Sequence, residues 1–437
     1  MINPELIIGC AVACFIAIVG SLALLASWNN RAAMRTQVAL FLAAFTIRFA
    51  LSVLLYGFDL NEKIVGDGDD SGWAGGLMIK ETWEAQGFSL YELPRALLGA
   101  FDGTNRGYKY LLAAYFSITG VPSRLSVAAL NCLCGALTAV FAFRIARIHF
   151  SEWVAVRAGW WTGLFPGLII WSAQTVKEPI VILLEALALY GCLRLGADGF
   201  RIRYVVLSSA AVVVLASMRF YAAYVAGAVI LLSLSVPQFN RRKLTRRKPT
   251  LASALAMGTI ALPLLYYSGA LANHVGEFEK WDLQQTERFR HDIAAGTGSG
   301  VETQHDMQTV QGLGLATFVG GAHLLLAPFP WNMTGGSLRL LLTIPEQLVW
   351  WCLFYSGVLP GLRHVLRHRL GDVLPMLLFV LSLGLIYSLT FGNIGVVYRQ
   401  RAQLLPSLLI FAAVGRELRH RPLPGQAEDP RVGVGAQ

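Results

Sequence analysis

Charged residues are scarce in this sequence, and their scarcity excludes most soluble folds. Asp, Glu, Lys and Arg make up 14% of the 437 residues, whereas hydrophobic residues make up 55%. A typical soluble domain carries about 25% charged residues. We therefore expect an all-α, polytopic membrane protein with one helical membrane domain and appended loops, in place of two or three soluble domains.

Cysteine is absent from the two longest loops, residues 58–107 and about 268–313. This absence excludes disulfides within those loops. Cys132 and Cys134 are one residue apart, whereas the usual zinc-binding pair has a two-residue spacer. Only His364 and His368 share a helical spacing among the histidines, and we assign them to a basic loop. Neither residue type indicates a metal site.

Long apolar runs fill most of the chain. A membrane-crossing helix needs about 20 mostly apolar residues. We expect eleven spans, at 6–27, 37–57, 124–143, 155–172, 179–195, 204–218, 221–236, 250–267, 338–359, 373–390 and 402–416. The shorter runs 108–119 and 313–326 predict juxtamembrane or re-entrant helices. The first run follows Glu5 and has no basic segment before it, which favours a retained span over a cleaved signal.

The chain has a net charge of +10, and the distribution of its Lys and Arg residues indicates membrane topology rather than nucleic-acid binding. The densest basic run, 241–248, lies between two spans, where it predicts contact with anionic lipid head groups. Basic residues recur at alternate connections, and the two long loops are acidic. We therefore expect a multi-pass protein of the inner (cytoplasmic) membrane, with its N-terminus outside and its C-terminus cytoplasmic. Residues 1–36 would form an extra span and turn, 37–421 the main membrane domain, and 422–437 a disordered tail.

Three acids, Asp67, Asp69 and Asp70, lie in the first outward loop. Carboxylates packed this closely repel one another, so they usually bind a cation or act beside a reacting group. A calcium loop of the EF type is disfavoured because Met78 stands where the twelfth-position glutamate belongs. A solvated loop, a divalent-cation site for Mg or Mn and a general base all stay open.

Other polar residues fall at connections on the same predicted side. Arginine suits phosphate because its planar donors bind oxygens in pairs. The candidates for binding an anion are Lys177, Arg219, Arg399 and Arg401, with Glu178 beside the first, and the candidates for lining a substrate groove are Trp73, Tyr221, Trp331 and Tyr398. Each also has a simpler explanation as a helix cap, a snorkelling cation or an interfacial aromatic residue.

The order of these features resembles the GT-C superfamily of polytopic glycosyltransferases, particularly bacterial relatives of dolichyl-phosphate-mannose protein mannosyltransferases. The matching segments are Asp69-Asp70-Ser71-Gly72-Trp73, the span from Leu125 to Phe150, the turn from Trp171 to Pro179, Arg219-Phe220-Tyr221 and Tyr398-Arg399-Gln400-Arg401. The resemblance covers residues 38–235 well and 315–415 loosely. Trp73 replaces the family's tyrosine, the second acid is a glutamate preceded by lysine, and the first span is extra.

The resemblance implies a GT-C-like enzyme whose catalytic domain is 37–421. Asp69 would be the catalytic base and Glu178 the second functional acid. Asp67 and Asp70 would tune the base or bind Mg or Mn, and the four cations would bind the donor phosphate. The implied reaction moves a hexose or pentose, with inversion, from a polyprenyl-phosphate donor to a hydroxyl of a glycan, lipid or protein.

Two other classes stay open. A polysaccharide polymerase or ligase acting on undecaprenyl-linked glycans also combines many spans with outward arginines. A non-enzymatic lipid or glycan transporter should carry prominent charges in mid-span. Such charges are sparse here, with Arg48 and Glu185 the main examples.

Overall fold

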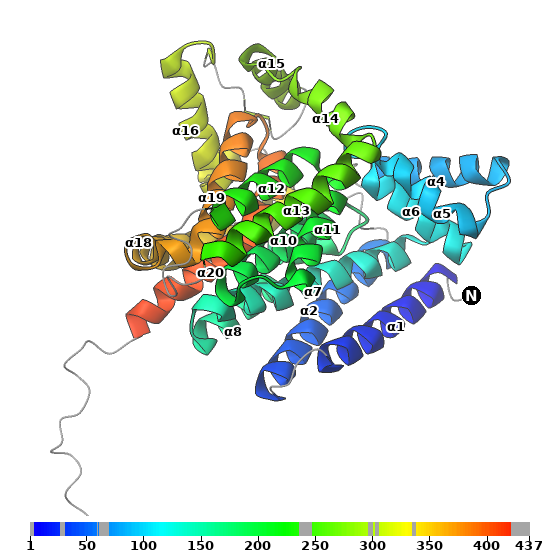
Figure 1. Cartoon of the computed structure of the whole chain (residues 1–437), viewed down its shortest axis with the longest axis horizontal. Helices are drawn as coiled ribbons and strands as arrows, with labels where there is room; N and C mark the ends of the chain where they lie inside the picture. Colours follow the sequence, from blue (N-terminus) through cyan, green and yellow to red (C-terminus); the bar gives the residue numbers. More distant parts are fainter. Residues whose placement is uncertain are drawn as a thin grey trace, which may run out of the picture.

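The computed structural model describes residues 4–26, 31–58, 60, 70–235, 247–295, 300–301, 306–333 and 338–420. These ranges are almost wholly helical and contain no strand, and their one isolated bridge joins Gly300 to Asn393. The helices form a bundle from which two groups of shorter helices project (Figure 1). The predicted all-α class is therefore confirmed.

Within the described residues, the helices follow one another along the chain with no strand between them. The first part of the chain forms α1 (Pro4–Ala26), α2 (Arg31–Gly57), α4 (Asp70–Ala85), η2 (Leu90–Glu92), α5 (Leu93–Ala96), η3 (Leu97–Phe101), α6 (Gly107–Thr119), α7 (Arg124–His149), α8 (Glu152–Leu164), α9 (Pro166–Ser172), α10 (Glu178–Asp198), α11 (Ile202–Met218) and α12 (Phe220–Ser235). The second part forms α13 (Arg247–Tyr267), α14 (Ala270–Phe278), α15 (Leu283–Ala294), α16 (Val310–Leu326), η6 (Pro330–Met333), α17 (Leu338–Leu353), η7 (Phe354–Val358), α18 (Leu359–His368), α19 (Leu370–Leu389) and α20 (Ile394–His420).

Each predicted span coincides with a helix or a broken helix. The span predicted at 155–172 breaks before Pro166 into α8 and α9, because proline lacks the N–H that continues a helix. Within the described residues, five helices are long and apolar enough to cross a membrane, or six if the pair 252–267 and 270–278, bent by 86°, counts as one span. The number of eleven spans stays a prediction.

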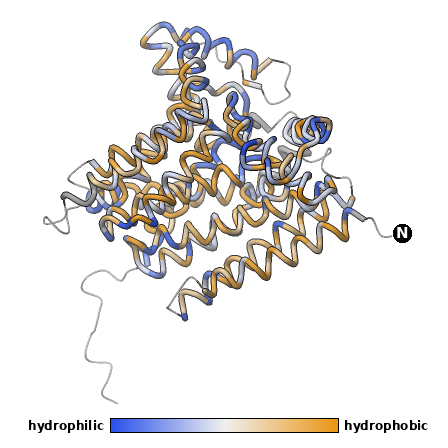
Figure 2. Tube along the Cα trace, turned by 45° about the vertical axis from the view of Figure 1, so that its right-hand side comes forward, coloured by the Kyte–Doolittle hydropathy of each residue, from blue (hydrophilic) through white to orange (hydrophobic). Residues whose placement is uncertain are grey.

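The centre of the bundle is formed by α7, α10 and α20. Helix α7 packs against α2, α8 and α10, and α20 packs against α8 and α18. Small residues on α7, such as Ala128, Ala136 and Ala142, are completely buried and let the neighbouring helices approach closely. By contrast, α1 lies along the outside and exposes Phe15 and Ile18. Figure 2 shows hydrophobic residues along most of the long helices, as expected for surfaces that face lipid.

The two long loops meet at one end of the bundle. The first contains α4 and α5 and leads into α6, and the second contains α14 and α15 (Figure 1). Asn273 Nδ2, on α14, donates to the carbonyl of Phe101 at 3.0 Å. Gly107, at the start of α6, lies so close to Ser217 that an added Cβ would be 2.3 Å from its Oγ. The loops predicted to share one side of the membrane therefore share one end of the molecule.

Candidate functional site

A broken span presents the central residues of the candidate site. Helix α9 ends at Ser172, a short turn follows, and α10 begins at Glu178. Pro179 stands in the first turn of α10, a position that proline favours because its N–H would be unpaired there. A carboxylate at a helix N-terminus is also stabilised by the helix dipole. Local sequence therefore places Lys177 and Glu178 at the start of a helix.

Arg48, on α2, replaces the hydrogen bonds that the break removes. Pro166 cannot donate to the carbonyl of Thr162, and Arg48 Nη2 donates to that oxygen at 3.4 Å. Its Nη1 donates to Gly163 O at 2.5 Å, and its Nε donates to Ser172 Oγ at 2.8 Å. Arg48 is completely buried, so these oxygens compensate for the water that its guanidinium loses.

The same face of α2 holds the turn after α9. Ser52 and Tyr56 follow Arg48 at successive four-residue steps, which align on one side of a helix. Ser52 Oγ donates to Ala173 O at 2.9 Å, and the backbone N–H of Thr175 donates to Tyr56 Oη at 3.0 Å. The turn is therefore fixed by side chains from a helix more than 100 residues earlier.

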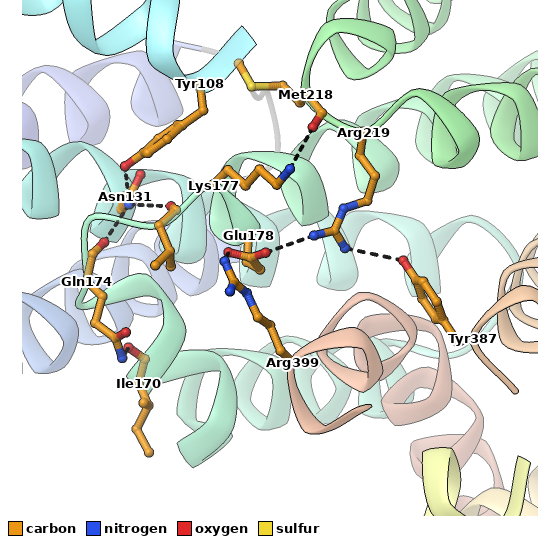
Figure 3. Close-up of polar contacts among 11 residues, drawn as sticks. Tyr108, Asn131, Ile170, Gln174, Lys177, Glu178, Met218, Arg219, Tyr387 and Arg399 are labelled. Carbon is orange, nitrogen blue, oxygen red and sulfur yellow. Dashed lines mark hydrogen bonds and ion pairs between the residues drawn. The ribbon is translucent and has the colours of Figure 1, made fainter. Parts of the chain in front are cut away.

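Asn131, on α7, holds the turn from the other side. Its Nδ2 lies 2.6 Å from Gln174 O and 2.8 Å from Val176 O, and donates to both (Figure 3). The same nitrogen lies 3.3 Å from Tyr108 Oη, on α6. Helix α6 packs against α4, so these contacts connect the first long loop to the turn before Glu178.

Glu178 lies between two arginines. Its side chain is 0% exposed, Arg219 Nη2 donates to Oε1 at 2.9 Å, and Arg399 Nη2 donates to Oε2 at 2.7 Å (Figure 3). Both carboxylate oxygens thus have a cationic partner, which a buried carboxylate requires. In this arrangement Glu178 is paired with both arginines and its side chain is closed to solvent.

Arg219 also belongs to a buried polar network. It occupies the break between α11 and α12, and its Nη1 donates to Tyr387 Oη at 3.4 Å. The amide of Gln403, in the orientation that satisfies its neighbours, accepts from Arg219, and its nitrogen donates to Glu185 Oε1 at 2.8 Å. The mid-span Glu185 is therefore connected to the site through α19 and α20.

Lys177 adds a third cation next to Glu178. Its Nζ donates to Met218 O at 3.2 Å (Figure 3). Burial, and then repulsion by Arg219, lower the pKa of Lys177 to about 7, although Glu178 opposes the shift. Lys109, on α6, also repels it. Arg219, Arg399 and Lys177 thus surround Glu178 with more than one positive charge, an arrangement that favours an anion.

Arg401 lies apart from this cluster. It is buried, and it donates to Ala327 O at 2.8 Å and to Gln347 Oε1 at 3.2 Å. Tyr398, one turn earlier on α20, donates to Glu346 on α17. These two predicted residues therefore join the C-terminal end of α16 and the middle of α17 to α20, whereas Arg399, between them, faces Glu178.

The predicted aromatic residues lie in different places. The ring centroid of Tyr221 is 6.1 Å from that of Tyr387, and the guanidinium of Arg219 is 5.9 Å from the ring, so Tyr221 borders the cluster. Trp73 packs edge-on against Phe116 with centroids 4.9 Å apart, on the α4–α6 pair. Trp331 is 67% exposed and stacks on Phe329. The structure brings only Tyr221 next to Arg219.

The acidic cluster lies largely outside the described residues. Asp67 and Asp69 are not among them, and of Asp70 only the backbone is described, as the first residue of α4. Among the residues that are described, no group of three or more His, Cys, Asp or Glu side chains could hold a metal ion. The roles assigned to the three acids, and a site for Mg or Mn, stay predictions.

Tyr387, Gln403 and Lys109 are residues of this site that sequence reasoning missed. Tyr387 and Gln403 sit inside apolar runs with no motif around them, and their relation to Arg219 depends on the packing of α19 and α20 against α12 and α10. Glu185 did give a signal, as a charge in mid-span.

Comparison with known proteins gives a family match over part of the chain and a likeness to solved structures. None of the curated proteins compared with the chain matched it. The archaeal oligosaccharyltransferase AglB from Archaeoglobus fulgidus, solved with an inhibitory peptide and a dolichol-phosphate, is 12% identical, with a TM-score of 0.49. The alignment covers 86% of this chain and 50% of AglB, so the chain spans about half the length of that protein. Residues 107–267, which contain Lys177, Glu178 and Arg219, match the family described as dolichyl-phosphate-mannose-protein mannosyltransferase, and the resemblance predicted from the sequence is thereby confirmed for this region.

Proposed function

We propose that the chain is a membrane glycosyltransferase that moves a sugar from a polyprenyl-phosphate donor to a hydroxyl acceptor on the outer side of the cytoplasmic membrane. The observation that carries this proposal is the buried Glu178 between Arg219 and Arg399, with Lys177 beside it. This cationic cluster lies at the end of the bundle that bears both long loops, and it falls partly in the region that matches the mannosyltransferase family.

The proposed reaction is a displacement at the anomeric carbon. A carboxylate takes the proton of the acceptor hydroxyl while the hydroxyl oxygen forms the new bond to the anomeric carbon. The bond from the anomeric carbon to the donor phosphate oxygen breaks, and the polyprenyl phosphate leaves with the electron pair. Attack opposite the leaving group inverts the anomeric configuration. We assign the base to Asp69, with Asp67 and Asp70 tuning it or binding Mg or Mn.

The cations would stabilise the departing phosphate. Arg399 suits direct contact best, because its side chain is 30% exposed whereas that of Arg219 is 9% exposed. Glu178 would hold both guanidinium groups in place, so that little reorganisation is needed as charge develops on the phosphate. Arg401, buried against Ala327 and Gln347, would act through the position of Arg399.

The test is transfer by the purified protein in lipid nanodiscs. Undecaprenyl-phosphate carrying a radiolabelled hexose or pentose would be supplied with a membrane extract as the source of acceptor. We expect loss of labelled donor and formation of a labelled product, and we expect Asp69→Asn to reduce the rate by about 10²-fold or more. Full activity of a folded Asp69→Asn protein would refute the assigned base.

The same assay separates the other two classes. A polymerase or ligase would leave the monosaccharide donor intact and join undecaprenyl-diphosphate-linked repeats. A transporter would change no covalent bond and would only move donor between leaflets. Either outcome would replace the proposed function.

A further inference from the structure

Helix α18 lies at the end of the bundle opposite α4–α6 (Figure 1), and basic residues gather in its last turn. The helix spans Leu359–His368, and its inner side carries the buried residues Gly361 and Val365. Its outer side carries exposed Arg363 and Arg367, four residues apart. This face has no part in the cluster around Glu178.

Close backbone packing fixes the orientation of this face. Gly361 lies so near α20 that an added Cβ would be 1.9 Å from Phe411 O. An added Cβ on Gly415, in turn, would be 2.0 Å from Gly357 O, in the π-helical segment η7. Because these contacts involve backbone atoms, α18 cannot rotate without losing them. Arg363 and Arg367 must therefore point away from the bundle.

The outer face of α18 forms a shallow concavity of about 410 Å³. It is lined by Tyr355, Leu359, Pro360, Arg363, His364, Arg367 and His368. The aromatic and aliphatic residues precede the basic ones along the helix, so one end of the concavity is apolar and the other is cationic. Leu366 and Leu370 nearby are also exposed. This polarity matches an amphiphile that has an anionic head group.

Among the residues that the structure describes, no carboxylate pairs with either of the two arginines. The ion pairs of the described residues involve neither Arg363 nor Arg367. The acids at this end face other partners: Glu152 contacts Arg147, Asp198 contacts Arg194, Asp372 contacts His149 and Glu417 contacts Ser151. The positive charge of the concavity is therefore available to an external anion.

We propose that the concavity on α18 binds the phosphate of an anionic glycerophospholipid, with the acyl chains along Tyr355 and Leu359. Two arginines four residues apart on one helix face can both donate to one phosphate group. An exposed apolar surface beside the arginines favours a membrane lipid over a soluble phosphate. This site does not depend on the proposed glycosyl transfer.

Lipid retention tests the proposal. The full-length protein would be placed in nanodiscs of equal parts phosphatidylcholine and phosphatidylglycerol, and retained lipids would be counted by native mass spectrometry. We expect the wild type to retain phosphatidylglycerol preferentially. The double variant Arg363→Gln/Arg367→Gln should lower that retention by roughly tenfold, because each arginine contributes to the attraction of an anionic head group.

Matched variants separate a site from general surface charge. Arg416→Gln/Arg419→Gln removes the same charge from the C-terminal turns of α20, outside the concavity, and should change retention less than about twofold. Arg363→Lys/Arg367→Lys keeps the charge and should retain most of the binding. Equal losses in the two glutamine pairs, no lipid preference in the wild type, or displacement of the lipid by inorganic phosphate would each overturn the proposal.

Discussion

At the scale of single residues, the candidate site depends on one carboxylate that water does not reach. Glu178 is a ligand for two arginines from α11–α12 and α20, and it lies at the start of a third helix, α10. Removing one partner of a buried ion pair leaves the other charges without compensation, and this typically costs about 3–5 kcal/mol.

Glu178→Gln should therefore destabilise the protein by roughly 3 kcal/mol or more. The amide has the same shape but cannot balance Arg219 and Arg399. The check is the denaturant midpoint of the purified protein in detergent. Glu178→Gln/Arg399→Gln should recover part of the loss, because one of the two uncompensated cations is gone. An unchanged midpoint in the single variant would show that the pairs contribute nothing to stability.

Lys177 predicts a pH dependence. Its pKa of about 7 lies below the ordinary value of 10.5, so between those values the unfolded chain binds the extra proton. Its contribution to stability therefore increases as pH rises from about 7 to 10.5. The binding of a phosphate ligand should instead weaken as pH rises, because the cationic form of Lys177 is lost above about pH 7.

We expect the KM for the proposed polyprenyl-phosphate donor to rise between about pH 6 and pH 9 in the wild type. Lys177→Arg should flatten this rise, because a guanidinium stays charged across the range. The measurement is donor KM as a function of pH for both proteins. Parallel pH profiles would assign the dependence to another group.

At the scale of elements, two sets of contacts between helices stabilise the bundle. One is a polar face on α2, and the other is close backbone packing at glycines of η7, α18 and α20. Arg48, Ser52 and Tyr56 supply the hydrogen bonds that the break between α8 and α9 removes. Gly357, Gly361 and Gly415 let η7, α18 and α20 approach at backbone distance. The first set of contacts positions Glu178, and the second orients the basic face of α18.

Arg48→Met should lower both the melting temperature and the rate of transfer. Methionine fills similar space but leaves the carbonyls of Thr162 and Gly163 without a donor, which costs about 1–3 kcal/mol for each buried group. Arg35→Met, on an exposed position of α2, is the matched control and should change neither. Equal behaviour of the two variants would show that Arg48 does not support the turn.

Gly361→Ala should destabilise the protein, because its Cβ would overlap Phe411 O on α20. The control is Gly258→Ala in α13, where nothing lies within 4 Å of an added Cβ. That change should be neutral or stabilising by about 0.5–1 kcal/mol, because alanine favours a helix over glycine. Thermal unfolding of the two variants in one detergent gives the comparison, and a tolerated Gly361→Ala would contradict the tight contact.

At the scale of the whole molecule, the bundle separates two ends with different properties. One end bears α4–α6, α14 and α15 (Figure 1), and the turn before Glu178 is connected to α6 there through Asn131 and Tyr108. The other end bears α18 and the C-terminal turns of α20, where basic residues gather. The charge bias of the loops predicts that the first end faces the outside of the cell.

Labelling of intact cells tests this orientation. Tyr91, on η2, is 81% exposed. A cysteine introduced at this position should therefore react with a membrane-impermeant maleimide. A cysteine introduced at His368, at the end of α18, should react only after the cells are permeabilised. The parent protein, with its six native cysteines, measures the background. The reverse pattern would invert the topology and place the candidate site in the cytoplasm.

The sequence by itself determined the helical class, the positions of the long apolar helices and the candidates at the turns, whereas the helices α4, α5, α14, α15 and α18 lie in segments predicted as loops. The features that the sequence determined depend on local properties, namely the length of apolar runs and the residues that begin and end helices. It also singled out Lys177, Glu178, Arg219 and Arg399. Their grouping required the tertiary structure, because the ion pair between Glu178 and Arg399 joins residues 221 positions apart. Packing likewise separated Arg401 from the cluster and added Tyr387 and Gln403.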